Sequence, residues 1–213
     1  VLSVLAGFTM FGLLLYAPLL FQGGFGYSPK EAGLLVTPLV VCITIGSIVN
    51  GRIITRIPRP NAMLYAGFAM LALALLGLSQ ATRGMHHNLL LSIMLLAGLG
   101  LGFILPNLTV FAQQTAGRAH LGIATAMLQS LRMVGGMVGT ALVGTLVTRS
   151  YTSGVTSALA AANATDWTAR MTDPQILIDK AAQAELLTNL QQAGHNGALL
   201  LEQARVSLVG AIH

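Results

Sequence analysis

The sequence predicts an all-α membrane protein, a polytopic bundle of transmembrane helices. Two observations support this prediction: the composition of the whole chain and the length of its apolar stretches. Hydrophobic residues make up 54% of the 213 residues, whereas charged residues make up only 8%. Soluble domains contain about 25% charged residues, because their surfaces must be hydrated. A chain with so few charges must be solvated by lipid over much of its surface.

Five apolar stretches are long enough to cross a bilayer, whose hydrocarbon core of about 30 Å requires about 20 mainly apolar residues in a helix. They cover residues 1–22, 33–51, 61–82, 88–114 and 121–148. A sixth begins near Leu199 or Ala204 and is cut short at His213. We therefore expect three parts: a five-span bundle over residues 1–148, an extracytoplasmic loop over 149–198, and the start of a truncated last span over 199–213.

Short breaks separate the five stretches. In the first break, Ser28 is a candidate N-cap and Pro29 suits the first position of a helix. Pro58 and Pro60 end the second stretch, because proline lacks a backbone N–H and clashes with the preceding turn. Residues 117–120, Gly-Arg-Ala-His, form the break before the fifth stretch. Connections this short predict that successive helices are antiparallel neighbours.

Basic residues indicate the orientation, because short cytoplasmic loops carry an excess of Lys and Arg. The loops after the first and third stretches contain Lys30, which is next to Glu31, and Arg83. The loops after the second and fourth stretches are richer in basic residues: Arg52, Arg56, Arg59, Arg118 and His120. We therefore place this second pair of loops in the cytoplasm and the segment 149–198 outside it.

The outer segment also contains a predicted amphipathic helix. Asp173 and Pro174 suit its cap and first turn. Apolar residues then recur at a helical period: Leu177, Ala181, Ala184, Leu187 and Leu190.

Acidic side chains are almost absent from the predicted spans. Glu31 is the only Asp or Glu before Asp166. General acid–base catalysis and cation sites depend largely on carboxylates, so the sequence argues against an enzyme, a metal site or a proton relay built from these helices. The single cysteine, Cys42, excludes a disulfide framework or a zinc site. The Lys and Arg residues are scattered singly among few aromatic residues, which is not the pattern of a nucleic-acid-binding surface.

Arg132 is the one deeply placed charge. It lies about twelve residues into the fifth stretch, roughly 18 Å along a helix. An arginine near the membrane centre costs at least ~2.5–3.5 kcal/mol on insertion scales, so it should face protein or water. Other residues share its stripe because they recur at spacings of three and four: Thr125, Gln129, Gly136 and Gly139. Two interpretations carry about equal weight: a cavity residue for substrate or coupling, and a structural arginine bonded to helix-end carbonyls of a neighbouring span.

Small residues and a proline indicate how the helices pack. Two Gly-x-x-x-Gly pairs allow a neighbouring helix to approach closely: Gly98 with Gly102, and Gly135 with Gly139. Pro106 frees a carbonyl of its own helix, so we expect Pro106 and Asn107 to face the protein interior.

Four stretches, in this order and spacing, resemble the major facilitator superfamily and, within it, the fourteen-span drug:proton antiporter family (EmrB/QacA type). The first is Tyr-Ala-Pro-Leu-Leu-Phe-Gln from Tyr16, followed by Gly-Tyr-Ser-Pro-Lys-Glu-Ala-Gly from Gly26. The second, Gly51-Arg52 with Arg56 and Arg59, looks like the C-terminal repeat of the family's cytoplasmic Gly-Arg loop. The third is Gly-Leu-Gly-Leu-Gly over residues 98–102, which leads to Pro106. The fourth covers residues 122–139, from Gly-Ile-Ala-Thr-Ala through Leu-Arg-Met-Val-Gly-Gly to the last glycine.

The resemblance implies that the chain is most of a C-terminal six-helix half, and we expect a fragment of a longer protein, since it has no starting Met. It implies multi-pass insertion in the bacterial cytoplasmic (inner) membrane and export of drugs or other amphipathic small molecules by alternating access. Export would be driven by the proton gradient, with no cofactor. The partners would be the lipid bilayer, protons, the substrates and the missing N-terminal half, which would have to supply the coupling carboxylates; no nucleic acid is expected.

The resemblance also suggests roles for individual residues. A cytoplasmic gating loop would contain Gly51, Arg52, Arg56 and Arg59. Candidates for the substrate cavity are Arg132, Gln129, Thr125, Asn107 and Tyr16, although an interfacial anchor suits Tyr16 somewhat better. Helix packing and a kink would depend on Gly98, Gly102, Pro106, Gly135, Gly136 and Gly139. The alternatives are a membrane structural or assembly protein, and a non-drug metabolite exporter of the same fold.

Overall fold

The computed structural model describes residues 1–54, 60–81, 85–161, 167–172, 180–192 and 197–210. The regular elements in these ranges are all helices. Five helical stretches are long and apolar enough to cross a membrane: Leu2–Gly24, Pro29–Ile53, Asn61–Ser79, His87–Ala116 and Arg118–Ala160. The predicted all-α, five-span architecture is confirmed.

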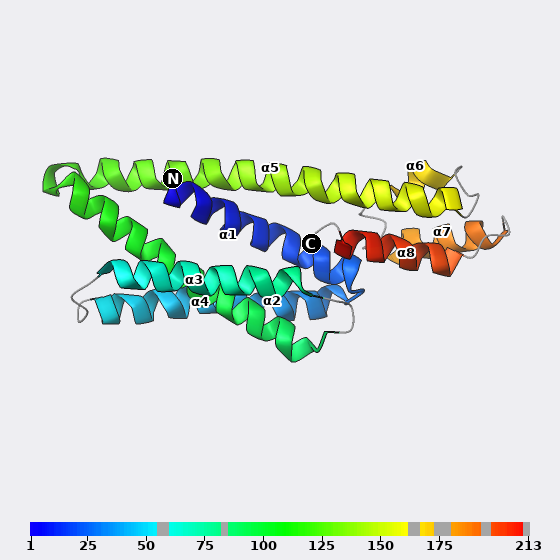
Figure 1. The fold of residues 1–213 in the computed structure, drawn as a ribbon, viewed down its shortest axis with the longest axis horizontal. Helices are drawn as coiled ribbons and strands as arrows, with labels where there is room; N and C mark the ends of the chain where they lie inside the picture. The colour runs from blue at the N-terminus through cyan, green and yellow to red at the C-terminus, as the bar shows by residue number, and fades with distance from the viewer. Residues whose placement is uncertain (55–59, 82–84, 162–166, 173–179, 193–196, 211–213) are drawn as a thin grey trace. The chain divides into compact units, whose positions relative to one another are not determined.

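The spans are built from the following elements (Figure 1). Helix α1 (Leu2–Leu19) continues as a π-helical segment, η1 (Leu20–Gly24), and is followed by α2 (Pro29–Ile54), α3 (Pro60–Ser79) and α4 (His87–Ala116). A 3₁₀ turn, η2 (Arg118–His120), leads into α5 (Leu121–Ala161). Three shorter helices follow: α6 (Thr168–Met171), α7 (Lys180–Gln192) and α8 (Gly197–Gly210).

Packing divides the chain into two compact units. Unit 1 contains Val1–Leu15 and Gly33–Ala141, and unit 2 contains Tyr16–Ala32 and Leu142–His213. These units are defined by contacts between helices. They do not test the predicted boundaries at residues 148 and 198, which concern where the chain leaves the membrane.

The break between the first two spans has the expected helix cap. Helix α2 begins at Pro29, and the Ser28 hydroxyl accepts a hydrogen bond of 3.3 Å from the Glu31 N–H. In return, the Glu31 carboxylate accepts bonds of 2.8 Å from both the N–H and the hydroxyl of Ser28. This capping box satisfies donors that the first turn of a helix leaves unpaired. At the expected break after α4, Gly117 has a φ of 73°, a left-handed conformation that favours glycine.

In unit 1, α4 is the most enclosed span. Half of its most apolar window is buried, compared with 22% to 33% for the other four spans. Helix α3 packs along it, and Gly100 of α4 lies against Leu71 of α3. On the side of α2, a Cβ added at Gly98 would overlap the Leu39 carbonyl oxygen, and one at Gly102 would lie 2.7 Å from the Ile43 oxygen. The glycines of α4 therefore bring its backbone into contact with both neighbours.

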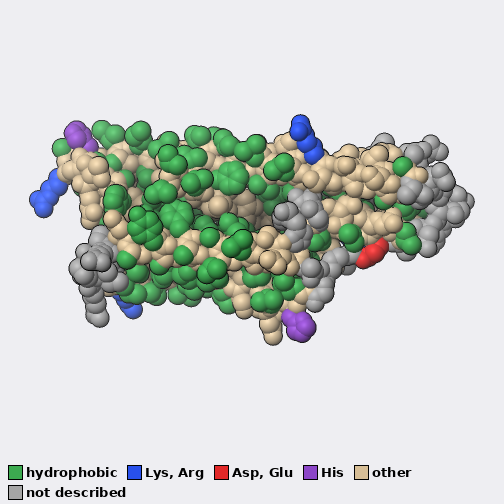
Figure 2. Space-filling view, in the orientation of Figure 1, with side chains coloured by type: hydrophobic (Ala, Val, Ile, Leu, Met, Phe, Trp, Pro, Cys, Tyr) green, Lys and Arg blue, Asp and Glu red, His purple; other side chains and the backbone are tan. Residues whose placement is uncertain are grey.

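Helix α1 packs against α5 in the same way. A Cβ added at Gly135 of α5 would overlap the carbonyl group of Val4, and one at Gly139 would lie 2.8 Å from the Cα of Phe8. Because the nearest atoms belong to the backbone of α1, no side-chain rotation can make room there. On the face shown in Figure 2, hydrophobic side chains are spread over much of the described surface, and charged side chains are few.

Unit 2 has a hydrophobic core of its own. Four core residues recur at every fourth position of α5: Val147, Tyr151, Val155 and Leu159. They pack with residues of the three short helices: Met171, Leu186, Leu190, Leu200, Leu201, Ala204 and Leu208. Because this stripe is apolar, α5 continues to Ala161 as one helix beyond the predicted end of the span at residue 148. A helix of 41 residues is about 60 Å long, roughly twice the hydrocarbon thickness, so part of it extends beyond a bilayer.

The short helices of unit 2 lie in the predicted outer segment and the start of the sixth stretch. Helix α7 buries Leu186 and Leu190, whereas Ala184 is exposed, so its buried face differs slightly from the predicted stripe. The predicted start of this helix at Asp173-Pro174 lies outside the described residues. Helix α8 packs against η1, where Val209 contacts Gly24.

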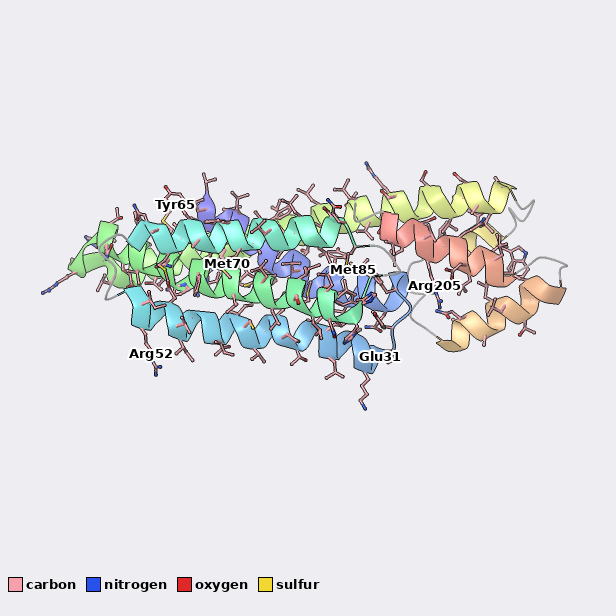
Figure 3. The ribbon with its side chains drawn as sticks, turned by 60° about the horizontal axis from the view of Figure 1, so that its bottom comes forward. Glu31, Arg52, Tyr65, Met70, Met85 and Arg205 are labelled. Atoms are coloured by element: carbon pink, nitrogen blue, oxygen red, sulfur yellow. The ribbon has the colours of Figure 1, made fainter. Side chains whose placement is uncertain are left out.

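Replacing Tyr151 by phenylalanine is expected to loosen unit 2 locally. The buried Tyr151 hydroxyl donates a hydrogen bond of 2.8 Å to the Met171 carbonyl oxygen, and its loss would cost about 1 kcal/mol. Faster amide hydrogen exchange in α6 would report this change. Tyr65→Phe is the matched control, because the Tyr65 side chain is 71% exposed and points away from the helices (Figure 3). Unchanged exchange in Tyr151→Phe would contradict the prediction.

Candidate functional site

Arg132 lies on the face of α5 that contacts α1. A Cβ added at Gly7 of α1 would overlap the Arg132 carbonyl oxygen, and Gly136, one turn further along α5, lies against the ring of Phe11. The Arg132 side chain is half-buried. Its Nε and Nη2 atoms are buried and have no hydrogen-bond partner among the residues that the structure describes. The helix-end carbonyls of the structural interpretation are thus not bonded to these two donors in the described part of the chain.

The two polar residues predicted to share the stripe of Arg132 lie in different surroundings. Thr125 is half-buried, accepts a hydrogen bond of 3.1 Å from Gln113 Nε2, and donates one of 2.8 Å to the Leu121 carbonyl oxygen. Gln129 is exposed. The bond to Gln113 joins the end of α4 to the beginning of α5, so the structure connects Thr125 to α4.

Asn107 lies in the contact between α4 and α2. Its side chain is 4% exposed, and its Nδ2 atom donates to Asn50 Oδ1 at 2.9 Å and to the Phe103 carbonyl oxygen at 2.8 Å. Asn50 of α2 is 1% exposed. Asn50 was not among the predicted site residues, although a polar residue directly before Gly51 in an apolar stretch was a signal for it.

Pro106 lies inside α4, and the helix continues through it. Because proline has no N–H, the carbonyl of Gly102, four residues earlier, lacks its helical donor. The Ser47 hydroxyl of α2 lies 3.3 Å from that oxygen and 2.7 Å from the Ile43 oxygen, so its single proton serves both. The polar groups around Pro106 and Asn107 are thus satisfied by α2.

Tyr16 packs in unit 2. Its half-buried ring lies against the unit 2 core, and its hydroxyl lies where a Cβ of Gly144 would be placed. The candidate cavity residues are therefore not gathered in one cluster: Arg132, Thr125 and Asn107 belong to three different contacts of unit 1, and Tyr16 belongs to unit 2.

Two residues of the candidate gating loop are described. Gly51 and Arg52 are exposed at the end of α2, and no described atom lies within 4 Å of the position that a Cβ would take at Gly51. The Arg52 side chain extends away from the helices (Figure 3). Arg56 and Arg59 lie outside the described residues.

An apolar groove of about 510 Å³ lies at the end of unit 1 where α5 begins. It is lined by the first residues of α1, the last turns of α4 and the first three turns of α5; Phe111, Leu128 and Leu131 are among its residues. Met127 lines the groove too.

Comparison with known proteins identifies the family. Residues 1–140, which run from the start of the chain to within α5, match the Major Facilitator Superfamily. The chain belongs to the major facilitator superfamily. This is a family of transporters, not of enzymes, and the membership confirms the resemblance to the superfamily noted in the sequence.

Relatives within the superfamily have names that concern drugs and antibiotics. The chain is 30% identical over 139 residues to the multidrug transporter protein MdtP of Bacillus subtilis, covering 65% of this chain and 25% of the relative. It is 34% identical over 149 residues to the tetracenomycin C resistance and export protein of Streptomyces glaucescens, covering 69% and 27%. It is 27% identical over 151 residues to the methylenomycin A resistance protein of Bacillus subtilis, covering 71% and 32%. The chain spans about a quarter to a third of the length of these superfamily members.

Proposed function

We propose that this chain is part of a secondary active exporter of drugs or other amphipathic small molecules in a bacterial cytoplasmic membrane. The observation that supports this best is the superfamily match over residues 1–140 together with relatives named for multidrug transport, export and antibiotic resistance. In this proposal the chain is most of the C-terminal half of a fourteen-span antiporter. It moves against an N-terminal half, so that a substrate site between the halves opens in turn to each side of the membrane.

Proton entry drives export in this proposal, without a bound cofactor. The sequence contains no Asp or Glu from residue 32 to residue 165, so the carboxylates that carry protons belong to the other half. Arg132, Gln129, Thr125, Asn107 and Tyr16 contribute to the substrate cavity, and Gly51, Arg52, Arg56 and Arg59 to the cytoplasmic gate. A non-drug metabolite exporter of the same fold is the second candidate, because family membership alone does not select the substrate.

Cells that express the full-length gene are expected to retain less of a lipophilic drug or dye than cells with an empty vector. The difference should disappear when a protonophore collapses the proton gradient, because export against a concentration gradient then has no energy source. Measuring intracellular drug over time checks both points. Retention equal to that of the empty-vector cells, with the protein present in the membrane, would rule out the exporter, and efflux that survives the protonophore would rule out proton coupling.

A further inference from the structure

In the described part of unit 1, two nitrogen atoms on one edge of the Arg132 guanidinium group, Nε and Nη2, are buried without a hydrogen-bond partner. Buried polar groups are almost always hydrogen-bonded, because an unpaired donor away from water costs free energy. The Nε and Nη2 atoms of Arg132 are both buried and unpaired among the described residues. Arginine also keeps its positive charge in proteins, so this edge calls for a negatively charged acceptor and not only for a neutral one.

The geometry of this edge suits an anion that offers two oxygens side by side, such as a carboxylate or a phosphate. The N–H of Nε and one N–H of Nη2 lie side by side in the guanidinium plane and point in the same direction. Two parallel donors match the two oxygens of a carboxylate, which arginine binds in a bidentate manner. A monovalent carboxylate would satisfy both donors and neutralise the charge at once.

An apolar compartment adjoins Arg132. Leu131, the preceding residue of α5, and Leu128, one turn earlier, line the groove of about 510 Å³. Its other lining residues include Phe111 of α4 and Met127 of α5, which are 46% and 63% exposed. The lining of the groove thus reaches Leu131, the residue next to Arg132 in α5.

We propose that the substrates of this exporter are amphipathic carboxylic acids, whose carboxylate binds the Nε–Nη2 edge of Arg132 while the apolar body occupies the groove. The inference rests on the proposed export function and narrows its substrate class. Lipophilic cations are disfavoured at this edge, because the charge of Arg132 repels them. An acidic side chain from the rest of the transporter could supply the carboxylate in place of the substrate, and the experiment separates these two sources.

The test compares three probes of matched hydrophobic body in energised membrane vesicles that contain the full-length protein. The probes are a fluorescent long-chain carboxylic acid, its methyl ester and the corresponding quaternary ammonium compound. The wild-type protein is expected to transport the acid about 10- to 100-fold more efficiently than the ester, in kcat/KM, because a charge-assisted pair is lost in the ester. The ammonium compound should be the poorest substrate.

Substitutions then assign the preference to Arg132. Arg132→Gln should lower kcat/KM for the acid about 10- to 100-fold more than kcat/KM for the ester, so that the preference for the acid disappears. Arg132→Lys should restore the preference only in part, since Lys lacks the paired donors. Arg149→Gln is the matched control, because Arg149 is an exposed arginine of the same helix. Phe111→Ala should raise KM for the acid and the ester alike, because both have the same apolar body.

The outcomes separate the failure of this inference from that of the proposed function. Equal loss of acid and ester transport in Arg132→Gln would mean that Arg132 pairs with an acidic side chain of the transporter, which overturns the inference. Wild-type transport of the ester or the ammonium compound in preference to the acid also overturns it, while export itself stands. Transport of none of the three probes overturns the inference, and the drug-efflux measurement described above decides separately whether the proposed function fails.

Discussion

Replacing Gly135 by alanine is expected to destabilise the protein by about 2 kcal/mol, the cost of overpacking a close contact less the gain in helix propensity. The added methyl group would overlap the carbonyl group of Val4, so α1 and α5 would have to separate. The midpoint temperature of unfolding of the purified full-length protein in detergent checks this prediction. We expect the substitution to lower it by several degrees.

Two glycines serve as matched controls. At Gly122 of α5 and Gly12 of α1, no described atom outside the adjoining turn of the same helix lies within 4 Å of the position that a Cβ would take. Alanine at either position should leave the midpoint unchanged or raise it slightly, because alanine favours a helix more than glycine does. If Gly135→Ala behaved like these two controls, the contact between α1 and α5 described above would be wrong.

Breaking the buried pair of asparagines is expected to have the second-largest effect. Asn107→Leu removes the Nδ2 group that donates a hydrogen bond to Asn50 Oδ1. The Asn50 side chain is only 1% exposed, so its oxygen would lose this bond in a buried position. We expect a loss of about 1–2 kcal/mol, within the range for an unsatisfied buried group and for hydrogen bonds between membrane helices.

A double-mutant cycle tests whether the two asparagines act as a pair. Asn50→Leu alone should also destabilise the protein, and the double substitution should cost less than the sum of the two single ones, since no polar group is then left unpaired. Asn88→Leu is the control, because Asn88 is an exposed residue in the first turn of the same helix. Strict additivity in thermal unfolding would show that Asn50 and Asn107 do not depend on each other.

Much of the fold could be predicted from the sequence, because membrane insertion depends on local composition. A run of about 20 apolar residues needs lipid wherever its neighbours lie, so the five spans could be recognised one at a time. The cap at Ser28 and Glu31 was equally local, since its two residues are three positions apart. The extension of α5 to Ala161 was missed because the spacing of Val147, Tyr151 and Val155 indicates a helix only once partners for that stripe are known.

The candidate site was less predictable. Spans that are apolar on all sides do not indicate which face meets protein and which meets lipid, so periodicity could not identify partners. Gln129 was placed beside Arg132 by spacing alone and is exposed, whereas Asn50, the hydrogen-bond partner of Asn107, lies 57 positions away in the sequence. The roles of these residues in a cavity stay predictions that the transport experiments address.

The sequence alone therefore determined that this chain contains five long membrane spans with a single deeply placed charge and no acid beside it, because hydropathy and charge are properties of each segment. Only the tertiary structure decided which groups meet: Ser47 with the carbonyl freed by Pro106, Asn107 with Asn50, and α1 with the glycines of α5. It also decided that two donors of Arg132 are buried without a partner in the described part of the chain. Such pairings depend on contacts between segments far apart in sequence. At these contacts a glycine, which lacks a Cβ, lets two helices approach closely, and a hydroxyl group such as that of Ser47 can bond a carbonyl of the neighbouring helix.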